Sequence, residues 1–246
     1  DVIIKHSYIK NVGLETCKLF CYEEIDTPIF EFAELFTKPL GETSDIITKE
    51  NYIFNDRSEN TLMLRPEGTT SVVRAAINAG LTQSLPKRFC YFGPMFRYER
   101  PQKGRLRQFH QLGTELLGID NFYGDVEVIS LAYQFLKNLQ ISDKVILTIN
   151  SLGDEESRFG YRQALVSFLG KYKDQLSKES KIRLVNNPLR ILDSKHYNDK
   201  IILNEAPKYR KYLNKNSRVY FENLCKSIDE LKIPYKIDDK LVRGLD

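Results

Sequence analysis

Side chains that could hold a charged ligand recur at every second position within the segment Phe96–Glu115. They are Arg97, Glu99, Phe109, Gln111, Gly113 and Glu115, with a short basic loop between the second and the third. Alternate side chains of a β-strand share a face, so two strands would gather guanidinium, carboxylate and amide groups on one surface. Such a surface suits a site that holds a nucleotide triphosphate beside a small polar ligand.

The loop at Arg100–Arg107 contains four Lys or Arg side chains together with Pro101 and Gly104, which discourage regular structure. We therefore predict a long antiparallel hairpin with a mobile basic loop. A solvated edge hairpin with scattered charges is the alternative. Gly113 favours the ligand site, because glycine weakens a strand and is tolerated best where a ligand or another backbone approaches closely. His110 faces away from this surface by the same alternation, so we do not assign it a catalytic role.

A second segment, Thr61–Gly80, predicts a strand, an interruption at Pro66 and then a helix. The hydroxyl of Thr69 or Thr70 could cap that helix. Glu67 has two interpretations: a helix-start carboxylate favoured by the helix dipole, or a carboxylate at a strand end that binds a ligand ammonium group. The sequence leaves both open.

Four segments together resemble the catalytic domain of class II aminoacyl-tRNA synthetases, and specifically the histidyl-tRNA synthetase family. They are LRPEGTT at Leu64–Thr70, GPMFRYERPQKGRLRQFHQLGTELLG at Gly93–Gly118 (the family's motif 2), NPLRILDSK at Asn187–Lys195 and LVRGLD at Leu241–Asp246. The resemblance covers essentially the whole chain in the same order. It implies an α+β (α/β) fold in which an antiparallel sheet is flanked by helices, with a helical insertion domain.

The resemblance also implies which residues bind which ligand. The histidine-binding residues would be Glu67, Gly68, Thr69, Gln111, Glu115 and Arg243, and the ATP-binding residues would be Arg97, Glu99, Arg105 and Phe109. A carboxylate and two neutral oxygens suit the three N–H donors of an α-ammonium group. Glu115 would accept a hydrogen bond from the imidazole. Arg97 and Arg243 would be the catalytic residues, acting at the α-phosphate.

The implied reaction activates L-histidine with ATP to histidyl-adenylate and then transfers the histidyl group to tRNA(His). Mg²⁺ would arrive with ATP, held chiefly by phosphates and waters; we expect no permanent cofactor and no metal site in the protein. Two alternatives stay open: a synthetase-like paralogue that senses histidine as a regulatory subunit, and an RNA-sensing module without aminoacylation. The retained ligand-binding residues favour the enzyme.

Three parts follow from the resemblance: a catalytic core over 1–152, a helical insertion domain over 153–232 and a return to the core over 233–246. Motif 1 lies near 7–28, at an expected homodimer interface, and motif 2 lies near 93–118. Periodicity predicts helices over 7–20 and 123–139, strands over 144–150 and 233–242, and between them helical segments at 155–176, 178–186, 201–204 into 209–213, and 217–231. Family members continue beyond Asp246 with motif 3 and an anticodon-binding domain, so we expect little activation by these 246 residues alone.

Composition is compatible with this interpretation. Residues 1–150 contain 17 Lys or Arg and 19 Asp or Glu, whereas residues 151–246 contain 20 and 14. The later part is therefore the basic part, which fits either contact with tRNA or a well-solvated helical surface. The four cysteines form no CxxC pair, and Cys17 and Cys21 are expected to be buried thiols one helical turn apart. With no long apolar run and no evident signal peptide, we expect a cytoplasmic protein without membrane contact.

Overall fold

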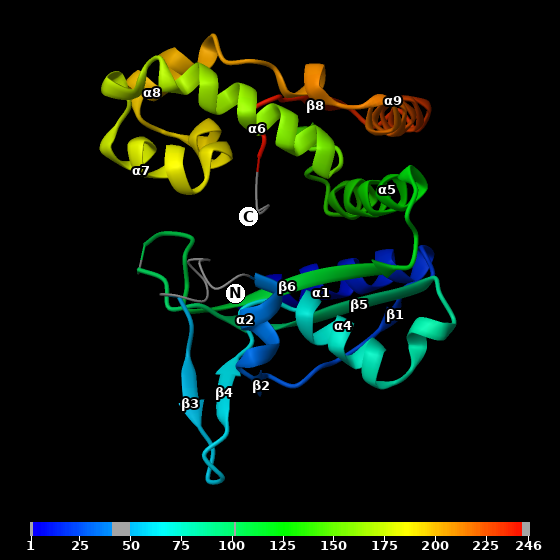
Figure 1. Cartoon of the computed structure of the whole chain (residues 1–246). Helices are drawn as coiled ribbons and strands as arrows, with labels where there is room; N and C mark the ends of the chain where they lie inside the picture. Colours follow the sequence, from blue (N-terminus) through cyan, green and yellow to red (C-terminus); the bar gives the residue numbers. More distant parts are fainter. Residues whose placement is uncertain (1, 41–49, 101, 243–246) are drawn as a thin grey trace. The chain divides into compact units, whose positions relative to one another are not determined.

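The computed structural model describes residues 2–40, 50–100 and 102–242. The chain divides into two compact units, Asp1–Ser142 and Asp143–Asp246 (Figure 1). The division falls after Ser142, whereas the sequence predicts the end of the catalytic core at residue 152. The assignment of a core, an insertion domain and a return to the core stays a prediction.

The first unit is organised around a three-stranded sheet in the order β1–β5–β6. β5 (Lys87–Phe96) and β6 (Gln108–Leu117) pair along their whole length in antiparallel register, with Tyr91 opposite Gly113. β1 (Glu23–Glu24) adds to β5 in parallel. The predicted long hairpin is therefore confirmed, and the basic loop joins its two strands.

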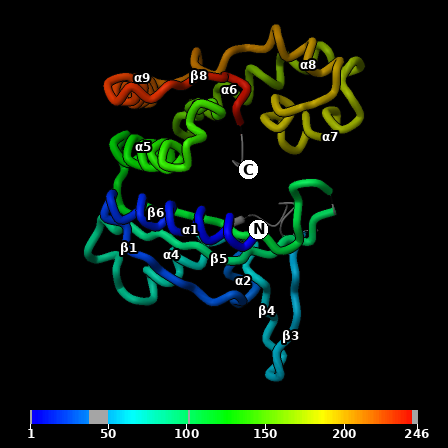
Figure 2. The backbone as a smooth tube through the Cα atoms, turned by 180° about the vertical axis from the view of Figure 1, so that it is seen from behind, coloured from blue at the N-terminus to red at the C-terminus, as the bar shows by residue number. Residues whose placement is uncertain are grey.

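Helices pack against both faces of this sheet. α1 (Val2–Leu19) contacts both strands of the hairpin and also α5 (Phe122–Asn138), and Figure 2 shows it running along β5 and β6. α1 approaches β6 closely at Gly13, where an added Cβ would lie 2.5 Å from the side chain of Leu112. α4 (Thr69–Asn78) packs on the opposite face through its apolar residues. Each face of the hairpin is therefore covered in part by a helix.

A second, antiparallel sheet of the first unit has the order β2–β4–β3. β4 (Thr61–Leu64) lies between β2 (Phe30–Phe32) and β3 (Ile53–Asn55). α2 (Glu34–Leu40) follows β2, and Met63 of β4 is fully buried in a cluster with Phe36 of that helix and Ala33 directly before it. The pair β3 and β4 extends away from the rest of the unit in both views (Figures 1 and 2).

Arg65, directly after β4, joins the two sheets. Its side chain is buried, and its guanidinium donates to the backbone oxygen of Pro94 at 3.0 Å, to the backbone oxygen of Thr27 at 2.6 Å and to the hydroxyl of Thr27 at 3.0 Å. Its backbone N–H donates to the carbonyl of Ile29 at 2.8 Å, and its carbonyl accepts from the N–H of Phe96 at 3.0 Å. One residue thus fixes the end of β4 against both β5 and the segment before β2.

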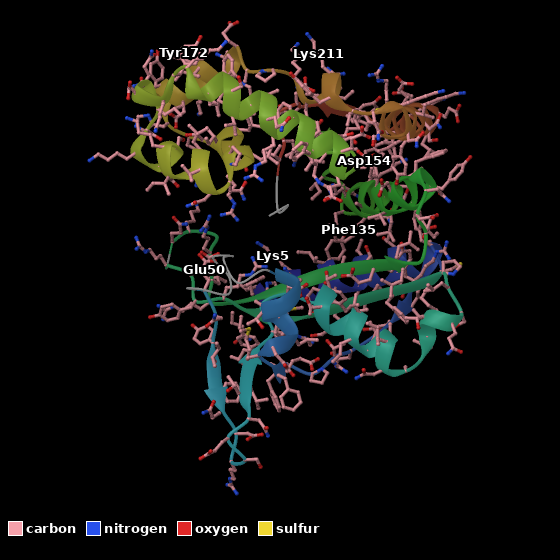
Figure 3. The ribbon with its side chains drawn as sticks, in the orientation of Figure 1. Lys5, Glu50, Phe135, Asp154, Tyr172 and Lys211 are labelled. Atoms are coloured by element: carbon pink, nitrogen blue, oxygen red, sulfur yellow. The ribbon has the colours of Figure 1, made fainter. Side chains whose placement is uncertain are left out.

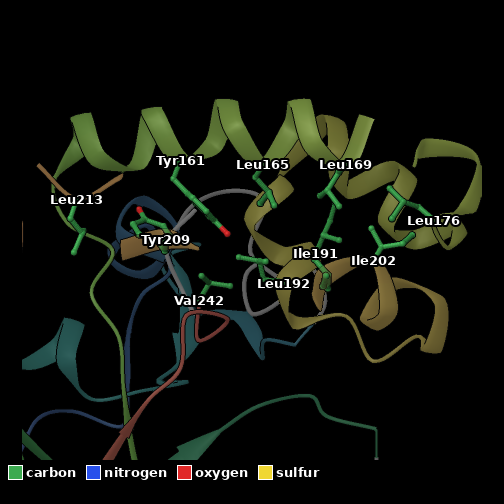
Figure 4. Packing of buried hydrophobic residues seen from close by; sticks show 11 residues of the cluster. Tyr161, Leu165, Leu169, Leu176, Ile191, Leu192, Ile202, Tyr209, Leu213 and Val242 are labelled. Carbon is green, nitrogen blue, oxygen red and sulfur yellow. The ribbon is translucent and has the colours of Figure 1, made fainter. Parts of the chain in front are cut away.

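The second unit is mainly helical. Tyr161, Leu165 and Leu169 point from α6 (Glu155–Gly170) into a buried cluster with Ile191 (Figure 4). The other helices are α7 (Lys178–Asn186), α8 (Tyr197–Asn204) and α9 (Lys215–Glu230), with 3-10 turns at Lys173–Gln175, Pro188–Asp193 and Tyr209–Tyr212. The carboxylate of Asp154, labelled in Figure 3, caps α6 by accepting from a backbone N–H.

Two helix boundaries of this unit differ from the predicted ones by four residues or more. α6 ends at Gly170 rather than continuing to residue 176, because glycine disfavours a helix interior and a 3-10 turn follows. α8 begins at Tyr197 rather than at residue 201. The first half of α8, Tyr197–Lys200, lacks the regularly spaced apolar residues that mark the second half, Ile201–Asn204.

β7 (Leu147–Ile149) and β8 (Tyr235–Ile237) match, in shorter form, the predicted strands over 144–150 and 233–242. They pair with each other in parallel, with Leu147 opposite Tyr235. In the sheets that the structure describes, neither strand joins β1, β5 or β6.

Asp199 is a fully buried carboxylate of the second unit. It accepts from the N–H and the hydroxyl of Ser177 at 2.9 and 2.7 Å, and from the hydroxyls of Ser180 and Ser194, both at 2.6 Å. Burial alone would raise the pKa of this carboxyl, but the hydrogen bonds outweigh burial and lower the pKa to about 2. The carboxylate therefore ties α7, the following turn and α8 together.

The four cysteines are free thiols. Cys17 is buried, as predicted, but Cys21 is exposed. The prediction for Cys21 is wrong because α1 ends at Leu19 and Cys21 takes a positive φ of 60° outside the helix.

We expect Arg65→Met to lower the free energy of unfolding of the first unit by about 3 kcal/mol, because two buried carbonyl oxygens lose their donors. Chemical denaturation followed by circular dichroism measures this change. Arg57→Met, in the exposed turn between β3 and β4, is the matched control and should change stability by less than about 0.5 kcal/mol. A loss below about 1 kcal/mol for Arg65→Met would contradict the joining role.

Candidate functional site

The first residue of α4 and the strand β6 are joined by a hydrogen bond. The hydroxyl of Thr69 donates to Oε1 of Glu115 at 2.7 Å, although the two residues are 46 positions apart in the sequence. The two segments that the sequence singles out are therefore brought together. Glu67, Thr69 and Glu115, all predicted to bind one ligand, lie at this junction.

Glu67 caps α4. Its Oε2 accepts from the N–H of Thr69 at 2.6 Å and its Oε1 accepts from the N–H of Thr70 at 3.0 Å. The prediction that Thr69 or Thr70 caps the helix is wrong, because the N-cap position is Gly68, which has no side chain, and the Thr69 hydroxyl bonds Glu115 instead. The helix-start interpretation of Glu67 is thus confirmed, and each oxygen keeps a lone pair for a further donor.

Glu115 is a half-buried carboxylate, and its hydrogen-bond donors among the described residues are two hydroxyl groups. Its Oε1 accepts from Thr69 and, at 3.3 Å, from the hydroxyl of Tyr91. Among the described residues, no Lys or Arg side chain pairs with it. Burial raises the pKa of the Glu115 carboxyl above its usual range, and the nearby Glu67 charge acts in the same direction, although the two hydrogen bonds oppose both effects.

Tyr91 lies between two glycines of the predicted site. An added Cβ at Gly68 would lie 2.2 Å from the Tyr91 ring, and one at Gly113 would lie 2.1 Å from it. Burial, followed by the charge of Glu115, raises the pKa of the Tyr91 hydroxyl to about 12. Our sequence analysis missed Tyr91, although its place opposite Gly113 in the hairpin register was an available signal.

Gln111 shares the face of β6 that carries Glu115 and Phe109, and it lies opposite Gly93 of β5. It is partly exposed, so its amide can reach a ligand. The shared face of these three side chains confirms the alternation that the sequence predicts. Their ligands stay predictions.

The side chain of Arg97 extends the same surface beyond the end of β5. Its Nε donates to the backbone oxygen of Pro66 at 2.9 Å, and its guanidinium lies 5.2 Å from the centre of the Phe109 ring. This arrangement orients the guanidinium through one hydrogen bond and one cation–π contact. The remaining N–H groups of Arg97 can bind an anion.

Two of the residues that are predicted to bind ATP, one in the basic loop and one directly before it, bind each other. The guanidinium of Arg105 donates to the carboxylate of Glu99 at 3.0 Å. Arg107 closes the loop: its guanidinium lies 4.2 Å from the centre of the Tyr98 ring, and its carbonyl accepts from the N–H of Arg97. The predicted contacts of Glu99 with the adenine edge and of Arg105 with the terminal phosphates stay predictions.

His110 faces away from this site, as predicted. Its ring stacks on Phe92, with centroids 5.4 Å apart, and meets the ring of His6 from α1 edge-on at 5.1 Å. Arg243 lies outside the described residues. Within the part of the chain that the structure describes, no group of three or more His, Cys, Asp or Glu side chains could hold a metal ion.

Residues 7–155 match the family profile described as "Histidyl-tRNA synthetase". The histidine–tRNA ligase of Rhodospirillum rubrum is 50% identical over 246 residues, which are 100% of this chain and 59% of that protein. The chloroplastic histidine–tRNA ligase of Gracilaria tenuistipitata is 51% identical over 239 residues, which are 97% of this chain and 57% of that protein. The chain thus spans about three fifths of the length of these relatives.

Solved structures give the same result. The crystal structure of apo S. aureus histidyl-tRNA synthetase is similar with a TM-score of 0.75 and 34% identity, covering 98% of this chain and 55% of that one. A structure from Bacillus halodurans, described as an ATP phosphoribosyltransferase regulatory subunit/histidyl-tRNA synthetase, is similar in fold alone, with a TM-score of 0.65 and 22% identity over 96% of this chain and 64% of that one. Because the family profile matches more than half of the chain, this protein belongs to the histidyl-tRNA synthetase family and has its class II, α+β fold.

Proposed function

We propose that this chain is the catalytic part of a histidine–tRNA ligase, which activates L-histidine with ATP and transfers the histidyl group to tRNA(His). The observation that carries the proposal is the hydrogen-bonded junction of Thr69 with Glu115, on the same strand face that presents Arg97 and Phe109. An amino-acid site and a nucleotide site thereby adjoin. The histidine–tRNA ligase names of relatives at 45–50% identity support it, whereas no specific observation favours a histidine-sensing paralogue or an RNA-sensing module.

The amino-acid part of the site would bind histidine at two places, the α-ammonium group and the imidazole ring. Glu67, Thr69 and Gln111 would accept from the α-ammonium group near Gly68, since acceptor oxygens suit its three N–H donors. Glu115 would accept from an imidazole N–H. A partly buried carboxylate that pairs with no cation among the described residues loses much when a ligand cannot donate to it, so this contact would reject apolar amino acids of similar size.

The nucleotide part would bind MgATP along the hairpin and its loop. Arg97 would hold the α-phosphate, Arg105 the terminal phosphates and Glu99 the adenine edge, while Phe109 would stack on the adenine. The ion pair with Glu99 uses one nitrogen of Arg105, and other N–H groups of the same guanidinium would bind the phosphates. We assign Arg243, in the chain's final segment, to the histidine carboxylate and the α-phosphate. Phosphate oxygens and waters would supply most ligands of the Mg²⁺ ion.

In the first step the histidine carboxylate attacks the α-phosphorus of ATP, and pyrophosphate leaves. A carboxylate with a pKa of about 3.5 is already ionised at neutral pH, so the step needs no general base. It needs alignment and neutralisation of the charge that develops on phosphate oxygens. We propose that the guanidinium of Arg97, which contacts Pro66 and Phe109, would do both.

We also propose a macromolecular partner and a cellular compartment for this protein. We propose that the basic residues of 151–246 contact tRNA(His), because phosphate neutralisation by Lys and Arg dominates such binding. No helix among the described residues is long and apolar enough to cross a membrane. Four free thiols fit a reducing compartment, and we propose the cytoplasm.

We further propose a homodimer that forms through motif 1 and the adjoining strand β2. Phe30 and Phe54 lie on one face of the second sheet with ring centroids 6.2 Å apart, yet they are 53% and 42% exposed. Phe32, on the same face, is 56% exposed. Exposed aromatic clusters of this kind mark interaction sites.

The catalytic proposal predicts histidine-dependent exchange of pyrophosphate into ATP by the full-length protein. Arg97→Gln should lower the exchange rate at least about a hundredfold, because removing one donor to the transition state costs about 3–4 kcal/mol. Arg57→Gln, in an exposed turn, is the control and should keep the rate. The absence of histidine-dependent exchange in the unaltered protein would refute the proposal.

Glu115→Gln should abolish measurable histidine activation and also stabilise the fold at neutral pH. A carboxyl whose native pKa is raised contributes less stability as pH rises through that pKa. We therefore expect the variant to melt at a higher temperature than the unaltered protein at pH 7, and the difference to vanish in acid, where the carboxyl is protonated in both the folded and the unfolded chain. Glu222→Gln, on the exposed side of α9, should melt like the unaltered protein at pH 7 and in acid. A lower melting temperature for Glu115→Gln at pH 7 would be the contrary result.

Phe30→Asp should weaken the homodimer at least about a hundredfold, because association would bury an unpaired charge worth about 3 kcal/mol or more. Light scattering after gel filtration of the full-length protein measures the dissociation. Val185→Asp, at a 74% exposed position of the second unit, is the matched control. If Phe30→Asp and Phe54→Asp both remain dimers, this face is not the interface.

A further inference from the structure

The two oxygens of the Glu115 carboxylate are not equivalent. Both hydroxyl donors, from Thr69 at 2.7 Å and from Tyr91 at 3.3 Å, lie on Oε1. Oε2 accepts from none of the described residues. Because an ionised carboxylate has about four acceptor positions, this arrangement leaves one whole oxygen for a ligand.

The Tyr91 hydroxyl is held in place by the packing around its ring. The ring is 9% exposed and lies in a cluster with Val72 and Ala76 of α4. Gly68 and Gly113 approach it so closely that a Cβ at either position would overlap the ring. A side chain enclosed in this way has little rotational freedom, so its hydroxyl has a fixed position and direction.

We propose that Tyr91 is a positioning residue that orients the Glu115 carboxylate, with Oε1 held by the two hydroxyls and Oε2 directed to an N–H group of the amino-acid ligand. The inference rests on the proposed function, because it assigns the imidazole of histidine as that N–H donor. Tyr91 itself touches neither ATP nor the reacting carboxylate in this assignment. It acts on specificity through Glu115.

The chemistry of the two groups supports this role. With its pKa raised to about 12, the Tyr91 hydroxyl stays protonated at neutral pH and keeps donating to the carboxylate. Glu115 is a pure acceptor when ionised, and it therefore pairs with a ligand N–H but not with a ligand lone pair. Without the Tyr91 hydroxyl, one donor remains on Oε1 and the carboxylate can rotate about its terminal bond, which is a soft torsion.

The test is Tyr91→Phe in the full-length protein, assayed by histidine-dependent ATP–pyrophosphate exchange. This change removes the hydroxyl and keeps the ring between the two glycines. We expect the KM for histidine to rise about tenfold, with the KM for ATP and kcat each within about twofold, because a ground-state contact to one substrate is weakened. Tyr123→Phe, at a 63% exposed position of α5, is the matched control and should leave all three constants unchanged.

A double-mutant cycle separates positioning from a purely structural effect. If Tyr91 acts through Glu115, Tyr91→Phe should weaken histidine binding about tenfold in the unaltered protein and less than about twofold in the Glu115→Gln background, as measured by calorimetry. Equal losses in both backgrounds would overturn the inference. A melting temperature of Tyr91→Phe within about 2 °C of the unaltered protein excludes misfolding as the cause.

Ligand discrimination gives a second measurement that does not depend on those constants. We expect Tyr91→Phe to lower the preference for histidine over a ring N-methylated histidine about fivefold, since the methyl group removes an N–H donor. An active unaltered protein with unchanged preference in the variant would refute the positioning role alone. An inactive unaltered protein would refute the proposed function and this inference with it.

Discussion

The buried guanidinium of Arg65 fixes the geometry on which the rest of the first unit depends. It donates to backbone oxygens from two separate segments and replaces the water that those oxygens would otherwise bind. Gly93 makes room for it, because a Cβ there would lie 2.3 Å from the guanidinium. The next residues along the chain, Pro66–Thr70, therefore have a fixed position beside the hairpin. The residues that we propose to bind the amino acid in Pro66–Thr70 are thus positioned by the same interactions that hold the two sheets together.

The site keeps a charge that the fold does not neutralise. Glu115 has two hydroxyl partners and no cationic partner among the described residues, while Glu67 adds a second negative charge nearby. Such an arrangement costs stability in the empty protein and favours a ligand that brings N–H donors or positive charge. In the part of the site that we propose for the nucleotide, Glu99 and Arg105 pair with each other.

Much of the arrangement of side chains on the hairpin could be predicted from the sequence, because alternate residues of a strand share a face. The alternation along β6 correctly separates Phe109, Gln111 and Glu115 from His110, since a strand has only two faces. Tyr91 was missed because it lies in a strand whose apolar character suggests ordinary core. The capping role of Glu67 and the Glu99–Arg105 pair were out of reach, since both depend on loop conformations that no periodicity describes. Pairing between β7 and β8 was missed for another reason, which is their distance along the chain.

That distance has a consequence for how the chain acquires its structure. Leu147 pairs with Tyr235, so 88 residues separate the partners (235 − 147 = 88). At synthesis rates of about 5–20 residues per second, β7 waits about 4–18 s for its partner. The hairpin of β5 and β6 is closed by a loop of about ten residues, which closes within about 100 ns once both strands exist. The first unit can therefore be complete while β7 still presents an unpaired edge.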